Sequence, residues 1–561
     1  MTPADKSAVW SGLSRPLDQY GSAKMRFMPP SGTANSGKLR FMANLQVVNA
    51  RLWTGDPGRP WAGAATIRDG RFTAVTPLDA AAAVAGAETP SAALDLGGAV
   101  VLPGLIDAHL HLLMGGESLS KLDLTAVSSR EEFEAAIARH HRSLPSDRWL
   151  LAHGWSEENW GGEAPSKAWL AAAGDRPTVC TRMDLHAALV NQAVLDQCDL
   201  TSDVPGGRIV RDASTGEPTG LLVEGAAWQL VNPVLPRPSA EEAQQHLRLA
   251  QEHLHRLGVT AVGSMEYQRQ IETVYEPLVD ELTLRCRLTV LDRNWPIDCE
   301  FGRQFPARGH DPSQLTVIGY KAFVDGTLGS RTAALLEDYA DDPGNRGLLI
   351  ELAREGHLHR WVHSVAKAGL SPSIHAIGDH AVRLALDALE DIGSERRPRI
   401  EHAQQIDPAD LTRFAGRIAS MQPLHKADDG RYAARRLGNE RLTGFFPFRQ
   451  LIDVGAHLAF GSDWPVVSCD PMLGVRAAVT GQTLAGQVIR PEENLTVDEA
   501  FRAYTDQAAY ALGFSDLGRV APGYRADLIV LDRDPWAIDW AQETPRVVRT
   551  IIAGHTVTTS G

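Results

Sequence analysis

His109 and His111 stand two residues apart in the sequence DAHLHL. The apolar segment around them predicts a strand end, and side chains two apart on a strand point to the same face. Two neutral imidazoles on one face can bind a single metal ion, because imidazole nitrogen is a common ligand of Zn²⁺. A structural histidine pair is the alternative, since an isolated H-x-H pattern is a weak signal.

Three more candidate ligands stand near the ends of apolar runs. His375 is in LSPSIHA, His402 in RIEHAQ and Asp463 in HLAFGSD. Any one of these histidines could be an ordinary core histidine. Because all three residues stand at the C-terminal ends of different predicted strands, where barrel enzymes place their catalytic groups, together they favour a metal site.

Lys321, in IGYKAFVDG, shares a strand face with Phe323 and Asp325. A lysine that faces the inside of a barrel is costly to bury while charged, so it must become neutral or gain a partner. A structural ion pair with Asp325 is the alternative to a role at the site.

The elements that position these residues alternate between apolar runs and helical segments, which is typical of parallel βαβ units. The eight candidate strands are residues 100–112, 259–265, 285–291, 316–326, 370–376, 399–404, 417–423 and 457–463. Eight such units predict a (β/α)8 TIM barrel over residues 101–517. The interval of about 115–255 is too long for one connection, so we expect an inserted subdomain after the first strand.

Both ends of this region are rich in short strands punctuated by Gly and Pro, at residues 42–100 and 518–561. They could pair into one small β domain, although alternation alone does not show that they do. Residues 1–41 lack both periodic apolar positions and the apolar stretch of a signal peptide. We expect a disordered extension there, with an ordered arm as the alternative.

Bulk properties exclude several classes of protein. The net charge of -14 and the lack of any long Lys/Arg run argue against a nucleic-acid partner. No apolar run is long enough to cross a membrane. The five cysteines are odd in number and form no C-x-x-C, which indicates a reducing compartment, and we expect a cytoplasmic location. The sequence leaves open whether the chain forms a homo-oligomer.

The motifs together resemble the amidohydrolase superfamily, and within it amidohydrolase family 3, which includes N-substituted formamide deformylases. The resembling stretches occur in the family's order and are VLPGLIDAHLHL, KAFVDGTLGSRTA, HAIGD, IEHAQ, MQPLH, GSDWPV and PGYRADLIVLD. The resemblance covers about residues 42–561. It implies a β-sandwich built from both chain ends, 42–100 plus 518–561, beside the barrel.

The resemblance also implies a role for each candidate ligand. His109 and His111 would bind a first metal ion, and His375 and His402 a second. Lys321, carboxylated on its amine, would bridge the two, and Asp463 would contact the first ion and transfer the proton. The implied cofactor is Zn²⁺ or another divalent metal, with two ions per chain.

Three further residues are candidates for contact with the substrate. His186, in MDLHAALVN, matches a family histidine that would polarise the substrate carbonyl, although Leu185 replaces the family's usual glycine. Trp155, in HGWSEENW, is a candidate pocket wall, with packing as the alternative. Arg331 could bind a substrate carboxylate, with a structural ion pair as an equal alternative.

The expected reaction is hydrolysis of an amide or related non-peptide C–N bond in a small molecule, by a metal-activated water. A metal-dependent esterase or a deaminase on the same fold is the first alternative, because fold does not fix substrate. Lys321 argues against a deaminase, since the family's deaminases generally use one metal and lack that lysine. A non-catalytic assembly protein is the second alternative, but such relatives lose ligands and this chain has them all.

Overall fold

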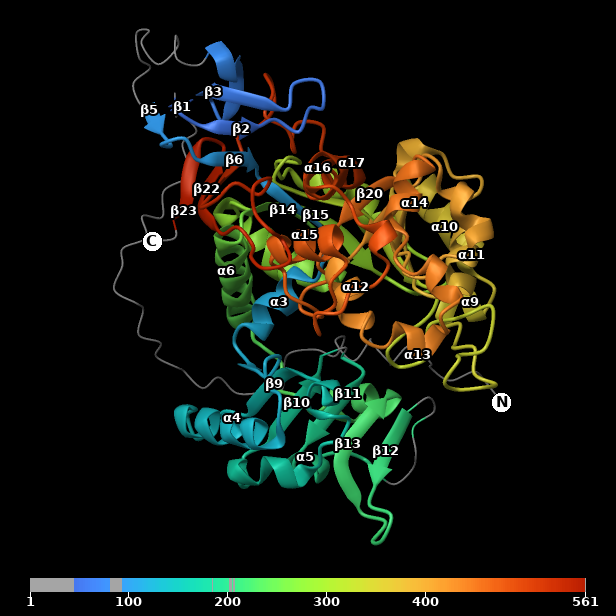
Figure 1. Ribbon diagram of the computed structural model, residues 1–561. Coiled ribbons are helices and arrows are strands. Elements are labelled where there is room, and N and C mark those ends of the chain that lie inside the picture. Colours follow the sequence, from blue (N-terminus) through green and yellow to red (C-terminus); the bar gives the residue numbers. More distant parts are fainter. Residues whose placement is uncertain (1–44, 81–92, 184, 201–203, 205–206, 560–561) are drawn as a thin grey trace. The chain divides into compact units, whose positions relative to one another are not determined.

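The computed structural model describes residues 45–80, 93–183, 185–200, 204 and 207–559 (Figure 1). The predicted extension at residues 1–41 lies outside the described residues. Contacts divide the described chain into two compact units, of which the smaller is formed by residues 118–239 and the larger by the rest. Within the described residues, no helix combines the length and the hydropathy needed to cross a bilayer.

Eight strands of the larger unit form one parallel sheet in the order β20-β19-β18-β17-β16-β15-β14-β7. These strands are β7 (Leu105–Leu110), β14 (Val259–Glu266), β15 (Arg285–Leu291), β16 (Leu315–Phe323), β17 (Ser371–Ala376), β18 (Arg399–His402), β19 (Ile418–Met421) and β20 (His457–Phe460). Each overlaps one of the eight predicted strands, and most are buried along their whole length, as expected for a sheet covered on both faces.

The first and last strands of this sheet meet and nearly close it into a barrel. Just after β20, the backbone amide of Asp463 donates to the His109 carbonyl at 2.7 Å. The amide of Ser462 donates to the Asp107 carboxylate of β7 at 3.0 Å. The sheet therefore fits the predicted TIM barrel, and its closure holds His109 beside Asp463.

Helices pack against the outside of these strands (Figure 1). Helix α6 (Ala240–Arg256) contacts β14 and buries Leu247, Ala250 and Leu254, which recur at helical spacing. Helices α10 (Leu358–Lys367) and α11 (Asp379–Ala388) pack on β17. The other helices of this unit include α3 (Leu112–Ser118), α8 (Glu300–Gln304), α12 (Pro423–Asp429), α13 (Ala433–Leu437), α14 (Phe448–Asp453), α15 (Pro471–Thr480), α16 (Val497–Ala503) and α17 (Asp506–Leu512).

The predicted first strand, residues 100–112, is two strands in the structure. Residues up to Pro103 form β6 (Val100–Pro103) of a different sheet, and β7 begins at Leu105. The two strands are separated at Gly104. A Cβ at this position would lie 2.3 Å from the Thr260 hydroxyl, so only glycine allows the backbone to pass this close to β14. The continuous apolar run conceals this boundary.

Both chain ends contribute to that second sheet, which has nine strands. Its strands are β1 (Leu45–Val48), β2 (Arg51–Trp53), β3 (Trp61–Arg68), β4 (Arg71–Pro77), β5 (Ala93–Asp95), β6, β21 (Leu528–Leu531), β22 (Val547–Ile552) and β23 (His555–Thr559). The two ends join where β21 pairs antiparallel with β6. The strand-rich ends thus pair as one sheet, and their arrangement as a sandwich stays a prediction.

The smaller unit contains a six-stranded sheet in the order β12-β13-β11-β10-β9-β8. Its strands are β8 (Leu122–Asp123), β9 (Leu150–Trp155), β10 (Thr178–Arg182), β11 (Ala187–Val190), β12 (Gly207–Arg211) and β13 (Pro218–Glu224). Helix α4 (Arg130–Ser143) begins after Ser129, whose hydroxyl accepts from the Glu132 amide. This unit follows α3 and ends before α6, whereas the sequence placed residues as far as about 255 in the insertion.

Candidate metal centre

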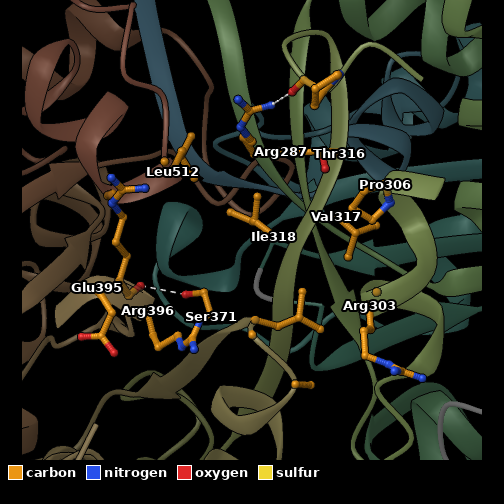
Figure 2. A pocket seen from close by; sticks show the side chains of 18 residues that line it. Arg287, Arg303, Pro306, Thr316, Val317, Ile318, Ser371, Glu395, Arg396 and Leu512 are labelled. Atoms are coloured by element: carbon orange, nitrogen blue, oxygen red, sulfur yellow. Dashed lines mark hydrogen bonds between the residues drawn. The ribbon is translucent and has the colours of Figure 1, made fainter. Parts of the chain in front are cut away.

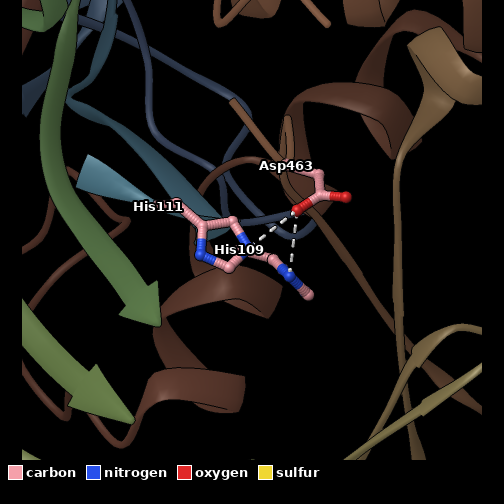
Figure 3. A group of neighbouring side chains, drawn as sticks. All are labelled: His109, His111 and Asp463. Atoms are coloured by element: carbon pink, nitrogen blue, oxygen red, sulfur yellow. Dashed lines mark ion pairs between the residues drawn. The ribbon is translucent and has the colours of Figure 1, made fainter. Parts of the chain in front are cut away.

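The six candidate ligands come together at the C-terminal ends of the barrel strands. His109 Nε2 lies 3.3 Å from Asp463 Oδ1, and His111 Nε2 lies 3.4 Å from the same oxygen (Figure 3). Lys321 Nζ is 3.4 Å from His109 Nε2. The His402 ring packs between the other histidines, with centroids 5.1 Å from His109 and 4.5 Å from His375. The strand ends thus bring all six residues into one cluster.

Hydrogen bonds from neighbouring side chains orient the imidazoles. His109 Nδ1 lies 2.7 Å from Glu401 Oε2, and His402 Nδ1 lies 2.8 Å from Gln422 Oε1. Both partner oxygens are acceptors, so the Nδ1 atoms carry the protons and the Nε2 lone pairs face the cluster. A carboxylate or amide oxygen behind each ring is the arrangement found behind metal-bound histidines.

The electrostatics of the cluster favour neutral imidazoles at His375 and His402, but not at His109. Burial and Lys321 oppose a charge on His109, but the Glu401 and Asp463 carboxylates outweigh them and raise its pKa. Burial, with help from the charge of Lys321, lowers the pKa of His375 to about 3. Burial also holds the pKa of His402 well below its usual value. Because a metal ion binds the unprotonated nitrogen, these rings are ready to act as ligands at neutral pH.

Lys321 is fully enclosed, with 1 % of its surface exposed. Burial lowers the pKa of its amine to about 8, although Glu401 and Asp463 oppose that change. The amine lies beside His109 rather than in an ion pair with Asp325, whose carboxylate instead accepts from the backbone amides of Ala334, Ile377 and Gly378. The structural alternative for Lys321, a salt bridge with Asp325, is therefore wrong.

His425 is a member of the cluster that the sequence analysis missed. It lies in the first turn of α12, and its ring stacks on that of His402 with centroids 5.9 Å apart. Ligand atoms of His402, His425 and Asp463 all lie within 4.8 Å of one another. The signal was present in MQPLH, one of the resembling motifs, but His425 stands on a helix and not at a strand end.

Unpaired atoms test whether these donors suit a metal ion. Among the described residues, His111 Nδ1, His425 Nε2 and Asp107 Oδ2 are buried and have no hydrogen-bond partner. Buried polar atoms are rarely left unpaired, because the loss of hydration is costly. The unpaired imidazole nitrogens lie next to the Nε2 atoms of His109 and His402 and the Asp463 carboxylate. This set of donors fits a divalent cation of the zinc type.

The residues predicted to contact substrate have different surroundings. Trp155 is 1 % exposed in the core of the smaller unit, and its Nε1 donates to the Cys180 carbonyl at 2.8 Å. These contacts are those of the packing alternative, and the role of Trp155 as a pocket wall stays a prediction. Arg331 forms the structural alternative, an ion pair with Asp341 at 2.9 Å.

His186 also lies in the smaller unit, where its ring packs edge-on against Trp228. The preceding Leu185 has a φ of 66°, in the left-handed region that glycine adopts without strain. The backbone conformation is therefore the one that glycine favours, and the catalytic role of His186 stays a prediction.

We predict that Gln422→Met weakens metal binding by about 10–100-fold, the usual effect of removing the partner behind a histidine ligand. Methionine keeps the side-chain length but removes the oxygen that accepts from His402 Nδ1. Gln422→Glu is the matched control, because it keeps an acceptor there. Titration with a chromogenic chelator measures both variants, and equal affinity in Gln422→Met and wild type would rule out this orienting role.

Known proteins resemble this chain over most of its length. A model of the amidohydrolase family matches residues 92–558. Protein LONG AFTER FAR-RED 3 of Arabidopsis thaliana is 34% identical, over 96% of this chain and 94% of that protein. N-substituted formamide deformylase of Arthrobacter pascens is 28% identical, over 91% of this chain and 98% of that protein.

Among solved structures, an uncharacterized metal-dependent hydrolase from Pyrococcus horikoshii is 28% identical with a TM-score of 0.71. The likeness covers 89% of this chain and 99% of that one. An adenosine deaminase from Xanthomonas campestris, at 14% identity and a TM-score of 0.51, shares the fold alone. The chain therefore belongs to the amidohydrolase family, in its family 3 branch, and is a hydrolase.

Proposed function

We propose that this protein hydrolyses an amide or related non-peptide C–N bond of a small molecule with the help of bound divalent metal. The observation that supports this most is the buried cluster in which four imidazoles, Lys321 and Asp463 converge at one end of the barrel. The relative named N-substituted formamide deformylase points to the same bond type.

The residues that would hold metal are His109, His111, Lys321, His375, His402 and Asp463. Two zinc ions, when bound, would acidify a water molecule and polarise the scissile carbonyl. Lys321 would serve as a carbamate, since a neutral amine can add carbon dioxide and so become an anionic oxygen ligand. At a pKa of about 8, roughly a tenth of the amine is neutral at pH 7, against less than about a thousandth for an ordinary lysine.

Asp463 would transfer the proton. Burial opposes its ionisation, but the facing His109 and His111 hold the pKa of its carboxyl well below the usual value. It can therefore accept a proton from the attacking water and pass it to the leaving nitrogen, which must be protonated because an amine anion is a poor leaving group. His186 is the candidate for polarising the carbonyl.

Two further proposals concern the setting of the reaction. The five cysteines are all free, which supports a reducing compartment such as the cytoplasm. Arg331 would have to leave its ion pair with Asp341 to bind a substrate carboxylate. We therefore propose that the substrate is a small amide that needs no carboxylate for binding.

A panel of N-formyl amines, N-acyl amines and N-acyl amino acids, with free amine as the readout, tests this function. We expect at least one class to release amine with the metal-loaded protein and not with His109→Asn/His111→Asn protein purified in parallel. The paired variant excludes contaminating host amidases. Release of alcohol from the matching esters, with no amine from any amide, would contradict the C–N assignment and favour an esterase.

A further inference from the structure

A cavity of about 410 Å³ lies at the opposite end of the barrel strands from the metal cluster. Thr316, Val317 and Ile318 at the start of β16 and Ser371 at the start of β17 line it (Figure 2). At about 3.3 Å per residue, the strand from Thr316 to Lys321 spans roughly 16 Å. The cavity is thus separate from the metal cluster, and its volume falls in the range of small-molecule sites.

The charged residues that line this cavity are mostly basic: Arg287, Arg303, Arg396, Arg397 and one acid, Glu395. Arg396 and Arg303 are exposed to solvent. Within the described part of the chain, the one ion pair of Arg303 is a long 3.9 Å contact with Glu300. Arg287 is 8% exposed. Four guanidinium groups with one carboxylate create a positive potential that attracts anions.

Arg287 is the exception among the buried arginines of the described chain. Arg285, Arg399 and Arg436 each form an ion pair, with Asp527, Glu401 and Asp341 respectively. Among the described residues, no carboxylate lies within ion-pair distance of Arg287. Burying a charge without a counter-charge is costly, so this position calls for an anion that the chain itself does not supply.

The contacts of Arg287 leave its charge uncompensated. Its Nη1 donates to the Pro312 carbonyl at 2.5 Å, and its guanidinium lies 3.8 Å over the Phe514 ring. Asp516 is the acidic group with the largest effect on the pKa of Arg287, but it is already paired with Arg71 and Arg525. Burial lowers the pKa of Arg287 to about 10, whereas Asp527 overcomes burial and raises the pKa of Arg285 on the same strand.

The backbone beside the cavity is held in a conformation that costs energy. Arg397 has a φ of 49°, and the Ser371 hydroxyl donates to its carbonyl at 2.7 Å (Figure 2). Gly513 lets the Arg397 guanidinium lie close, since a Cβ there would be 2.9 Å from its Nη1. Left-handed residues other than glycine persist where surrounding structure requires them. Here that structure positions a second arginine at the cavity.

We propose that this cavity binds a phosphorylated small molecule, with Arg287 and Arg397 holding the phosphate and the exposed Arg396 and Arg303 adding charge. The planar guanidinium group donates two parallel hydrogen bonds to a phosphate. The excess of positive over negative side chains suits a dianion better than a single carboxylate. The site lies apart from the metal cluster, so its ligand is neither the substrate nor a metal ligand.

Calorimetric titration of the metal-loaded protein with ribose 5-phosphate, inorganic phosphate, ribose and citrate tests this, at constant ionic strength. We expect saturable binding of ribose 5-phosphate and phosphate, and none of ribose. Arg287→Met should weaken the binding of ribose 5-phosphate by about 10- to 150-fold, which is the usual effect of losing one hydrogen bond to a charged group. Arg396→Gln, at an exposed position that tolerates substitution, should weaken it several-fold.

Arg354→Gln is the matched control, since Arg354 is an exposed arginine that does not line the cavity. It should bind like wild type. Binding of equal strength in wild type, Arg287→Met and Arg396→Gln would place the phosphate elsewhere, for example at the metal centre, and overturn the proposal. Saturable binding of citrate alone, or of no anion at millimolar concentration, would overturn it as well.

Discussion

Asp463→Asn is expected to lower kcat by about 10²–10⁴-fold, the typical effect of losing a general acid–base group. Asparagine keeps the size of the side chain and one oxygen facing His109 and His111, but it cannot accept and return a proton. Because the interaction belongs to the transition state, kcat and kcat/KM should fall together. The variant should fold normally and retain most of its metal.

The matched control is Asp470→Asn. Asp470 is a half-buried aspartate seven residues further along the chain. Its carboxylate caps α15 by accepting from the Met472 amide, which asparagine can also do. Its turnover should stay close to that of wild type. If excess zinc restores Asp463→Asn to near wild-type turnover, Asp463 is only a ligand, and its role in proton transfer is refuted.

Lys321→Ala is the second change with a large expected effect. Removing the amine would remove the proposed carbamate, so we expect the variant to lose one of the two proposed metal ions and most of its activity while keeping its fold. Metal analysis and circular dichroism measure both outcomes. In the wild-type protein, mass spectrometry under native conditions or electron density near neutral pH should show the added carboxyl group.

Lys426→Met is the control that shows whether metal is lost simply because a buried lysine has been replaced. Lys426 is 1% exposed, and burial lowers the pKa of its amine to about 8, as for Lys321. Its Nζ lies over the Phe448 ring and has no hydrogen-bond partner among the described residues. The control should keep both ions. A Lys321→Ala protein with its full metal content would show that Lys321 is not a bridging ligand.

The barrel strands could be predicted because each is a short apolar run followed by a polar residue at its end. The same pattern is enough to place His375, His402 and Asp463 at one end of the barrel. It fails for residues 100–112, because β6 and β7 are equally apolar and only the close approach of Thr260 to Gly104 separates them. Local pattern carries no information about that contact.

The surroundings of the ligands are harder to predict for a related reason. Glu401 and Gln422 lie behind His109 and His402 through contacts between segments far apart in the sequence or on different elements, and residue type alone does not indicate such contacts. Arg331 is equally suited by type to bind a substrate, and only the fold places Asp341 beside it. Trp155 is ambiguous by type as well, because aromatic residues serve both pockets and cores.

Metal analysis tests the central claim of metal-dependent hydrolysis most directly. It should use protein purified without chelator, with His359 and His363 changed to alanine. These two and Asp391 form an exposed group with ligand atoms within 4.8 Å, which could collect metal from the medium. We predict close to two zinc-like ions per chain, lost on replacing His109 and His111. Finding no bound metal, even after reconstitution, would contradict the account, and a firm value of one would replace the bridged pair with a single-metal mechanism.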